Sequence, residues 1–324
     1  MNIPSDLDRS VWTGRTDPED GDLGRRWHHV IRPVAPEPGV ALVGFACDAG
    51  VSRNRGRAGA AAGPLALRRM LANLAWHGAD PPRLYDAGDV ACVDDALETA
   101  QDAYADRIAA LLHARHFPIG LGGGHEIAWG AYQGLARALE GDSRLERLGI
   151  VNFDAHLDLR IGPQPGRGTS GTPFLQIAGS RAAAGLPFRY LCLGLSRPAN
   201  TRALLERAAG LGVEIVEDVE AGRSPAEARL ERFVAESSAI YLTFCLDVLP
   251  PAVAPGVSAP SSLGIALHRA VELLRRVLDH CRHGRPGGKL LLADVAELNP
   301  RHDPDGRTAR TAARIVHELA ALSY

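Results

Sequence analysis

The chain has 324 residues, a formal net charge of −2, 46% hydrophobic residues and 23% charged residues. This composition is ordinary for a globular protein with a large core, and no stretch is strongly basic, which excludes nucleic acid and anionic membranes as expected partners. Segment 1–22 is polar, so it does not resemble a signal peptide, and no apolar run is long enough to span a bilayer. The five cysteines are widely spaced. We therefore expect a cytoplasmic protein without a disulfide framework.

Residues 1–36 are rich in Asp, Arg and Pro and are predicted to form an N-terminal arm. Short apolar segments then alternate with amphipathic ones. The predicted strands are 40–47, 83–88, 117–123, 148–154, 189–195, 213–218, 239–247 and 289–295. The clearest predicted helices are 96–114, 264–281 and 308–322. Apolar strands alternating with helices are typical of a parallel sheet buried on both faces. The strand count fits either a closed barrel or an open sheet, and in both the chemistry gathers at the carboxyl ends of strands.

The strongest chemical signal is the segment NFDAHLDLR at 152–160, which follows an apolar strand. It carries Asp154, His156 and Asp158 at alternate positions. In an extended chain alternate side chains lie on the same side, so these three are expected to converge at the end of the strand. Two carboxylates and an imidazole suit a hard divalent metal ion. The alternative is a solvated polar loop.

A second signal is GLGGGHE at 120–126, where three glycines after a predicted strand precede His125. Glycines permit a tight turn that brings the histidine close to other groups. A phosphate-binding loop is the competing interpretation, but the spacing GxGxxG is not met. We therefore predict that His125 is a fourth metal ligand.

Two further strand ends carry candidate residues. The strand of TFCLD ends with Cys245 and Asp247, two positions apart and so expected on one side. The segment ADVAELNP at 293–300 ends an apolar strand at Glu297. In isolation such a glutamate is more often a solvated or capping residue.

In this order the four segments resemble the arginase/agmatinase (ureohydrolase) family, through GGGHE, DAHxDxR and ExNP, over roughly residues 40 to 322. Within that family the chain looks most like the formimidoylglutamases of histidine degradation, through segments 44–64, 170–174, 192–201 and 294–314. The resemblance implies an α/β fold, a three-layer α/β/α sandwich with a mainly parallel eight-stranded sheet, and a single catalytic domain at 37–324. It also implies a homo-oligomer, either a trimer or a hexamer.

The resemblance further implies two Mn²⁺ ions per subunit. His125 and Asp158 would bind one ion, His156 and Asp247 the other, and Asp154 both, while Glu297 would hold the cationic nitrogen of the substrate. The implied reaction is hydrolysis of N-formimidoyl-L-glutamate to L-glutamate and formamide by a metal-activated hydroxide.

Cys245 departs from the family pattern, which has an aspartate at this position as a bridging ligand. A thiolate can bind metals, but Mn²⁺ prefers oxygen. We therefore expect a second metal site that is weak, absent or occupied by Zn²⁺ or Fe²⁺. The alternative is a buried apolar cysteine. On oxidation we expect Cys245 to pair with Cys47, which ends the first predicted strand at the same edge.

A substrate with two carboxylates needs a cation nearby. Arg160 lies two residues beyond Asp158 and is expected to face the site if the strand geometry continues, where it would bind a carboxylate. Its alternative is a surface arginine. Ser170 and Gly171 would add a hydroxyl and backbone amides. Further substrate candidates follow the first strand: Arg53, Asn54 and Arg57.

Two alternatives to a formimidoylglutamase remain. A related ureohydrolase would act on a guanidino acid or on agmatine, but agmatine has no carboxylate for Arg160 to bind. The chain would instead be a catalytically impaired paralogue that binds small molecules if replacing the bridging aspartate by Cys245 prevents the metal pair from forming.

Overall fold

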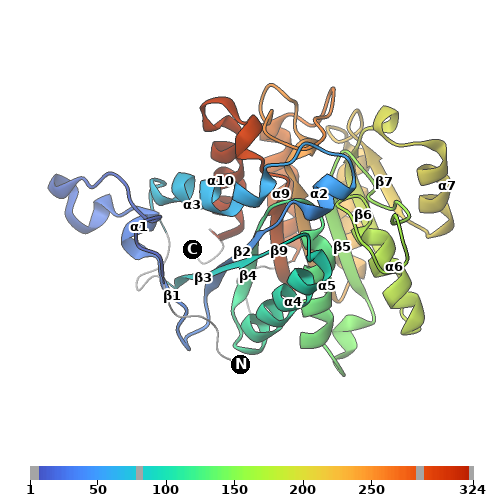
Figure 1. Ribbon diagram of the computed structural model, residues 1–324, viewed down its shortest axis with the longest axis horizontal. Coiled ribbons are helices and arrows are strands. Elements are labelled where there is room, and N and C mark those ends of the chain that lie inside the picture. Colours follow the sequence, from blue (N-terminus) through green and yellow to red (C-terminus); the bar gives the residue numbers. More distant parts are fainter. Residues whose placement is uncertain (1–6, 78–82, 282–287, 321–324) are drawn as a thin grey trace.

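A single parallel sheet runs through the middle of the protein. The computed structural model describes residues 7–77, 83–281 and 288–320. In these residues nine strands pair in the order β1-β3-β2-β4-β9-β8-β5-β6-β7, and every pairing is parallel (Figure 1). The strands are β1 (Arg32–Pro33), β2 (Val40–Ala46), β3 (Leu84–Ala91), β4 (Phe117–Gly122), β5 (Leu148–Phe153), β6 (Arg189–Leu195), β7 (Glu214–Glu217), β8 (Ala239–Cys245) and β9 (Leu290–Ala296).

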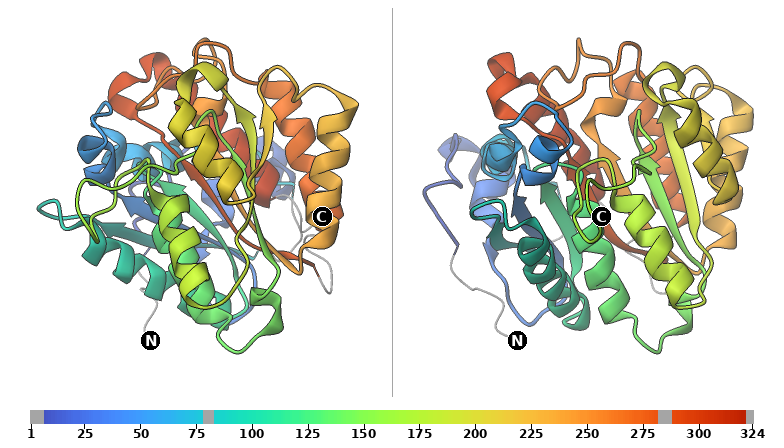
Figure 2. Two further views of the ribbon diagram at one scale, coloured as in Figure 1. Left: turned by 90° about the vertical axis from the view of Figure 1, so that its right-hand side faces the viewer. Right: turned by 45° about the vertical axis from the view of Figure 1, so that its right-hand side comes forward.

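Helices cover both faces of the sheet, as Figure 2 shows from two further directions. The helices are α1 (Trp27–Val30), α2 (Ala49–Arg53), α3 (Gly63–Ala72), α4 (Leu97–His113), α5 (Ile127–Ala138), α6 (Pro173–Ala183), α7 (Arg202–Gly210), α8 (Ser224–Glu236), α9 (Leu267–His280) and α10 (Arg307–Ala320). Side chains of α3, α8, α9 and α10 form one apolar cluster with the sheet, and those of α4, α5, α6 and α7 form a second. Neighbouring strand residues such as Leu42 and Val43 enter opposite clusters, because successive side chains in a strand point to opposite faces.

The predicted sandwich and its eight strands are confirmed, with one strand added. The additional strand, β1, is only two residues long and contains Pro33, so no apolar run marked it in the sequence. Helix α9 begins at Leu267 instead of the predicted position 264, where Gly264 adopts a φ of +73°. The last predicted helix is described as far as Ala320, and its positions 321–322 lie outside the described residues.

Part of the predicted N-terminal arm packs closely against the rest of the protein. Trp27 is fully buried, and β1 pairs with β3. The indole of Trp12 donates a hydrogen bond to Asp86 Oδ2 at 2.7 Å, and Arg68 binds the same carboxylate at 2.8 Å. These contacts anchor the segment to the edge of the sheet. No helix in the described ranges has the length and apolar character needed to cross a membrane.

Five adjacent strands position the candidate site. In the sheet β2, β4, β9, β8 and β5 are consecutive neighbours, although they are far apart in the sequence. Because all are parallel, their carboxyl ends lie at one edge, and the segments that follow them meet there. Every metal-ligand candidate identified from the sequence follows or ends one of these strands.

Candidate metal centre

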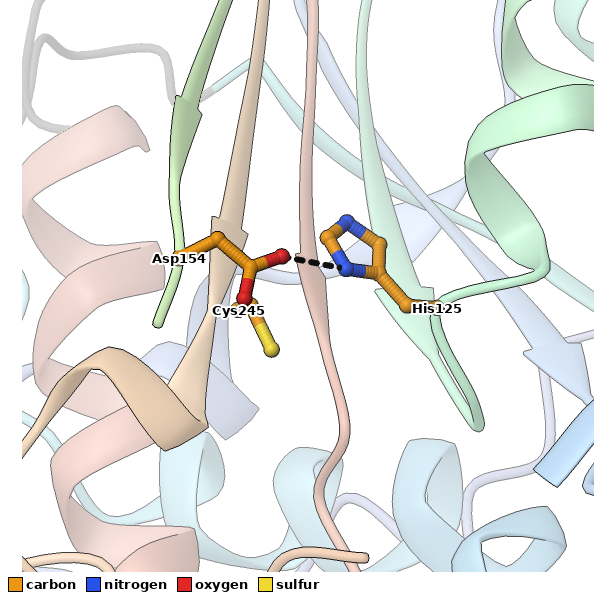
Figure 3. A group of neighbouring side chains, drawn as sticks. All are labelled: His125, Asp154 and Cys245. Atoms are coloured by element: carbon orange, nitrogen blue, oxygen red, sulfur yellow. Dashed lines mark ion pairs between the residues drawn. The ribbon is translucent and has the colours of Figure 1, made fainter. Parts of the chain in front are cut away.

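Two groups of possible metal ligands meet at this edge. His125, Asp154 and Cys245 place one donor atom each within 4.8 Å of one another, and so do Asp154, His156 and Asp247. Figure 3 shows that the first three side chains come from separate neighbouring segments and point into one space. Asp154 belongs to both groups. A pair of cations could therefore share this one carboxylate.

The side chains converge for a different reason from the one predicted. Strand β5 ends at Phe153, before the first aspartate, and Asp158 has a φ of +47°. Asp247 lies in a short 3₁₀ turn, Leu246–Val248, just beyond β8. The expectation that an extended chain continues through Asp158 and Arg160 is therefore wrong. Tight turns bring these residues together, and strand alternation does not extend to them.

His125 is placed as a metal ligand would be. Its Nδ1 lies 2.9 Å from Asp154 Oδ2 and 3.1 Å from Asp158 Oδ2. Neither contact meets the geometry of a hydrogen bond, so this buried nitrogen has no hydrogen-bond partner. Burial opposes the charged imidazole, but the two carboxylates outweigh burial and raise the pKa of His125 above its ordinary value. A nitrogen and two oxygens that face one point without bonding to each other are suited to a shared cation.

A chain of hydrogen bonds fixes the other side of the His125 ring. Tyr241 and Thr243 each donate a hydroxyl hydrogen bond to the buried carboxylate of Asp294, at 2.5 and 2.6 Å. The Thr243 oxygen can then accept from His125 Nε2 at 3.0 Å. With Nε2 as the donor, the lone pair of Nδ1 in the neutral ring faces the space that it shares with Asp154 and Asp158, where a cation would lie. Neither Thr243 nor Asp294 was predicted from the sequence, although Thr243 precedes Cys245 by two positions in the same strand.

The second group is supported in a similar way. His156 Nδ1 lies 3.1 Å from Asp247 Oδ2, and the backbone amide of His156 donates to Asp154 Oδ1 at 2.7 Å. Asn152 donates to Asp154 Oδ2 at 3.0 Å. The bridging candidate Asp154 is thus held at both oxygens. Asn152 was also missed, because an amide inside an apolar strand gave no signal of its role.

The donor set fits divalent metal ions. Asp154, Asp158 and Asp247 lie close together below the surface, and within the described ranges none forms an ion pair with Arg or Lys. Buried carboxylates without a cation are costly, and bound metal ions would supply the missing charge. Burial, together with the charges of Asp154 and Asp247, raises the pKa of the Cys245 thiol, so without metal it stays neutral.

Glu297 occupies the predicted place beside the cluster. Its Oε1 accepts from the His125 amide at 2.8 Å, and its Oε2 accepts from the Ser258 hydroxyl. Burial and the charge of Asp247 raise the pKa of Glu297 to about 7. Glu126, which had no predicted role, is fully buried and accepts from the Gly50 amide at 2.8 Å. It links the glycine-rich motif to the loop that follows β2.

A pocket of about 200 Å³ opens over these groups. The sequence-predicted residues that line it are His125, His156, Asp158, Arg160, Ser170, Cys245, Asp247 and Glu297. Asn54, a further candidate, also lines the pocket, as do several residues that were not predicted, among them Arg55 and Ser258. The floor of the pocket is acidic. Its described cationic side chains, the two histidines apart, are Arg55 and Arg160.

Three predictions about substrate contacts need correction. The Gly171 amide is already engaged with Thr169 Oγ1 at 3.2 Å, so it is not a free donor, and Gly171 does not line the pocket. Arg53 is held by Glu98 at 2.6 Å, and Arg57 by the carbonyl oxygen of Pro255 at 2.9 Å. Both arginines brace the loop after β2. The sequence placed them in the right loop but could not show which arginine was free.

The expected pairing of Cys47 with Cys245 is also wrong. Cys47 follows β2 and Cys245 ends β8, and the sheet places β4 and β9 between them. Three strand spacings amount to about 14 Å, whereas a disulfide needs Cα atoms within about 6.8 Å. All five cysteines are free. The thiol next to Cys47 is that of Cys92, which directly follows β3, the strand that pairs with β2.

Comparisons with known proteins agree with this geometry. The sequence profile of the arginase family matches residues 38–321. The chain is 51% identical to a formimidoylglutamase of Aeromonas hydrophila, over 97% of this chain and 98% of that protein. It is 53% identical to a formimidoylglutamase of Ralstonia nicotianae, over 96% and 95%. The crystal structure of Trypanosoma cruzi formiminoglutamase with Mn²⁺ has a TM-score of 0.76 at 26% identity, covering 88% of this chain and 93% of that one. The chain belongs to the arginase family.

Proposed function

We propose that this protein is a formimidoylglutamase, which hydrolyses N-formimidoyl-L-glutamate to L-glutamate and formamide in histidine catabolism. One observation carries the proposal: a pocket with a metal-ligand floor has unpaired arginine at its mouth. Such a pocket suits a molecule with a cation at one end and carboxylates at the other. Near-full-length relatives with about half their residues identical are formimidoylglutamases, which supports the same substrate.

The proposed cofactor is a pair of Mn²⁺ ions. His125 and Asp158 would hold one ion, His156 and Asp247 the other, and Asp154 both, because the two ligand groups meet at Asp154. Cys245 would complete the first group, and as a soft ligand it makes Zn²⁺ or Fe²⁺ alternatives to Mn²⁺. When bound, such a pair lowers the pKa of water from about 15.7 towards 7, which makes a nucleophile available at neutral pH.

The side chains of the protein would orient the substrate. The buried Glu297 presents a carboxylate oxygen to the amidinium, whose positive charge favours the ionised form of Glu297. Arg160 at the mouth would bind a carboxylate, and Ser170 would donate a hydroxyl hydrogen bond. Water adds to the amidine carbon, the bond from this carbon to the glutamate nitrogen breaks, and that nitrogen leaves after gaining a proton.

Two other functions remain as outcomes of the test. Agmatine carries no carboxylate and would leave Arg160 without a partner. A guanidino acid would supply one carboxylate, which could pair with one arginine of the pocket. A binding protein without activity would follow if Cys245 prevented assembly of the metal pair. The retained ligand geometry favours an enzyme.

We also propose that the protein is a cytoplasmic homo-oligomer, either a trimer or a hexamer. The five free thiols suit a reducing compartment. Analytical ultracentrifugation of the purified protein would give its mass in solution. A monomeric mass at micromolar concentration would reject the proposed assembly.

The decisive experiment combines metal analysis with product detection. The metal-free protein would be loaded separately with Mn²⁺, Fe²⁺ or Zn²⁺, and formamide release from N-formimidoyl-L-glutamate would be measured beside urea release from agmatine and 4-guanidinobutyrate. We expect formamide release with two metal ions per chain and little urea from either guanidine. Urea release without formamide release would reject the proposed substrate, and no turnover with any metal would favour the binding protein.

A further inference from the structure

We propose that Arg55 is a second acid-binding residue, so that Arg55 and Arg160 each bind one of the two carboxylates of the substrate. This inference rests on the proposed function, because it concerns how that substrate is held. It adds a specificity-determining residue from the loop after β2. Neither the sequence motifs nor the ligand geometry of the metal centre identifies this residue.

Arg55 has an unusual backbone and a free side chain. It follows α2 with a φ of +63°, a conformation that residues other than glycine rarely adopt. Its amide donates to the carbonyl oxygen of Ser52 at 3.0 Å, which closes the turn. Arg55 is exposed and lines the pocket, and its guanidinium forms no ion pair with any residue that the structure describes. A strained turn thus places an unpaired cation at the mouth of the candidate active site.

The neighbouring arginines differ from Arg55 in this respect. Arg53 contacts Asp95 and Glu98, and Arg57 is bound to backbone carbonyl oxygens. Both therefore have their hydrogen-bonding capacity engaged in holding the loop. Arg55 lies between them in sequence and is the arginine of this loop that lines the pocket. The loop has two structural arginines and presents one to the ligand.

Arg55 and Arg160 reach the pocket from loops that touch each other. A Cβ placed on Gly171 would lie 2.8 Å from the Arg160 Cδ and 3.0 Å from the Asn54 side-chain nitrogen. Asn54 also donates to Ser170 Oγ at 3.2 Å. The stem of Arg160 and the residue before Arg55 therefore contact the same glycine. Both arginines therefore line the same pocket from loops that meet at Gly171.

The charge pattern then matches a dicarboxylate. Two guanidinium groups that line one pocket without an ion-pair partner among the described residues favour a ligand that carries two anionic groups. N-formimidoyl-L-glutamate offers one carboxylate on its α-carbon and one at the end of its side chain, while its amidinium is drawn to the acidic floor. A guanidino acid with one carboxylate would leave one arginine unpaired. The two unpaired arginines therefore favour a substrate with two carboxylates over a guanidino acid with one.

The test removes each arginine and each carboxylate in turn. Arg55→Met, Arg55→Lys and Arg160→Met would be assayed, in the metal-loaded protein, on N-formimidoyl-L-glutamate and on two analogues. N-formimidoyl-L-2-aminobutyrate lacks the side-chain carboxylate, and 4-(formimidoylamino)butyrate lacks the α-carboxylate. For Arg55→Met we expect kcat/KM on the dicarboxylate to fall about 10- to 100-fold, mostly through KM, with partial recovery in Arg55→Lys. On the analogue that lacks the carboxylate bound by Arg55, kcat/KM should fall less than about threefold in Arg55→Met. In Arg160→Met the other analogue should be the one that is little affected.

Arg115→Met is a matched control. Arg115 is also an exposed arginine with a positive φ, +65°, but it precedes β4 at the opposite edge of the sheet. Its replacement removes the same charge from a similar backbone and should leave all three substrates unaffected. Calorimetric titration with L-glutamate gives a readout independent of turnover. Arg55→Met should weaken the binding of this product about tenfold or more, and Arg115→Met should not.

The outcomes separate this inference from the proposed function. If the unmodified protein releases no formamide from the dicarboxylate, the proposed function fails. If the unmodified protein is active and Arg55→Met loses equally on the dicarboxylate and on both analogues, Arg55 does not bind an acid and the inference is overturned. Unchanged kcat/KM and unchanged L-glutamate binding in Arg55→Met would overturn it as well.

Discussion

The floor and the mouth of the pocket are built in different ways. At the floor, Asp154 and His125 are buried, and each is oriented by further hydrogen bonds from side chains or backbone. At the mouth, Arg55 and Arg160 are exposed and their guanidinium groups have no protein partner among the described residues. The floor is preorganised by the sheet, whereas the mouth is carried by loops whose side chains are free to meet a ligand.

This difference separates chemistry from selectivity. A metal pair needs donors held within a few tenths of an ångström, and strands with short turns supply that precision. Recognition of the distal acid needs charge and reach, which loops can vary without disturbing the sheet. Changes at the floor should therefore affect every substrate alike. Changes at the mouth should affect substrates according to their carboxylates.

The largest effect is expected from Asp154→Asn at the floor. Asp154 belongs to both ligand groups, so the amide removes the shared anion and should abolish tight metal binding together with activity on every substrate. Elemental analysis after dialysis gives the metal stoichiometry, and circular dichroism checks that the fold is intact. An unchanged metal content would show that Asp154 is not the shared ligand.

At the mouth, Arg160→Ala should remove a charge-assisted pair worth roughly 1.5–3 kcal/mol. We expect the KM for N-formimidoyl-L-glutamate to rise accordingly, whereas formamidine, which has no carboxylate, should be hydrolysed about as well as by the unmodified protein. Steady-state kinetics on both substrates makes the measurement. Equal losses on the two would mean that Arg160 supports the loop and does not bind the acid.

A smaller effect at the floor is expected from Thr243→Val. The variant keeps the volume of the side chain but removes the hydroxyl between His125 and Asp294. Without this hydrogen bond the ring is free to change tautomer, and metal affinity should fall about 10- to 100-fold. Competition with a metal chelator measures the affinity. Thr243→Ser, which retains the hydroxyl, should bind nearly as tightly, and similar losses in both variants would point to packing instead.

The same contrast explains how much the sequence predicted. Apolar strands alternating with helices are a strong periodic signal. The eight longer strands and their parallel arrangement could therefore be predicted, while the two-residue β1 could not. The candidate metal ligands could be predicted because the His and Asp residues follow buried strands. The turns at Asp158 and Glu297, with φ values of +47° and +74°, could not be, because those residue types rarely adopt such angles.

Contacts between residues far apart in the chain could not be predicted from the sequence either. Arg53, Arg55 and Arg57 are chemically alike and two positions apart. Only the packing of Glu98 from α4 against Arg53, and of the segment Pro255–Val257 against Arg57, makes two of them structural. For the same reason the pairing of Cys47 with Cys245 was plausible until the strand order placed two strands between them.

The smallest expected change is a gain, from Cys245→Asp. Cys245 lies beside His125 and Asp154, so a carboxylate there would give the first group a hard ligand that suits Mn²⁺ better than a thiol does. Burial and the charges of Asp154 and Asp247 already raise the pKa of the thiol. Without metal, a further buried carboxylate would be disfavoured for the same reasons, so the metal-free variant should melt at a lower temperature. Mn²⁺ should therefore raise its Tm by more than it raises that of the unmodified protein, and Mn²⁺-dependent kcat should increase several-fold. Cys245→Asn, which has the shape without the charge, should show neither change. If Cys245→Asp binds no more Mn²⁺ and works no faster, Cys245 is a packing residue, and the metal pair is held by the remaining ligands alone.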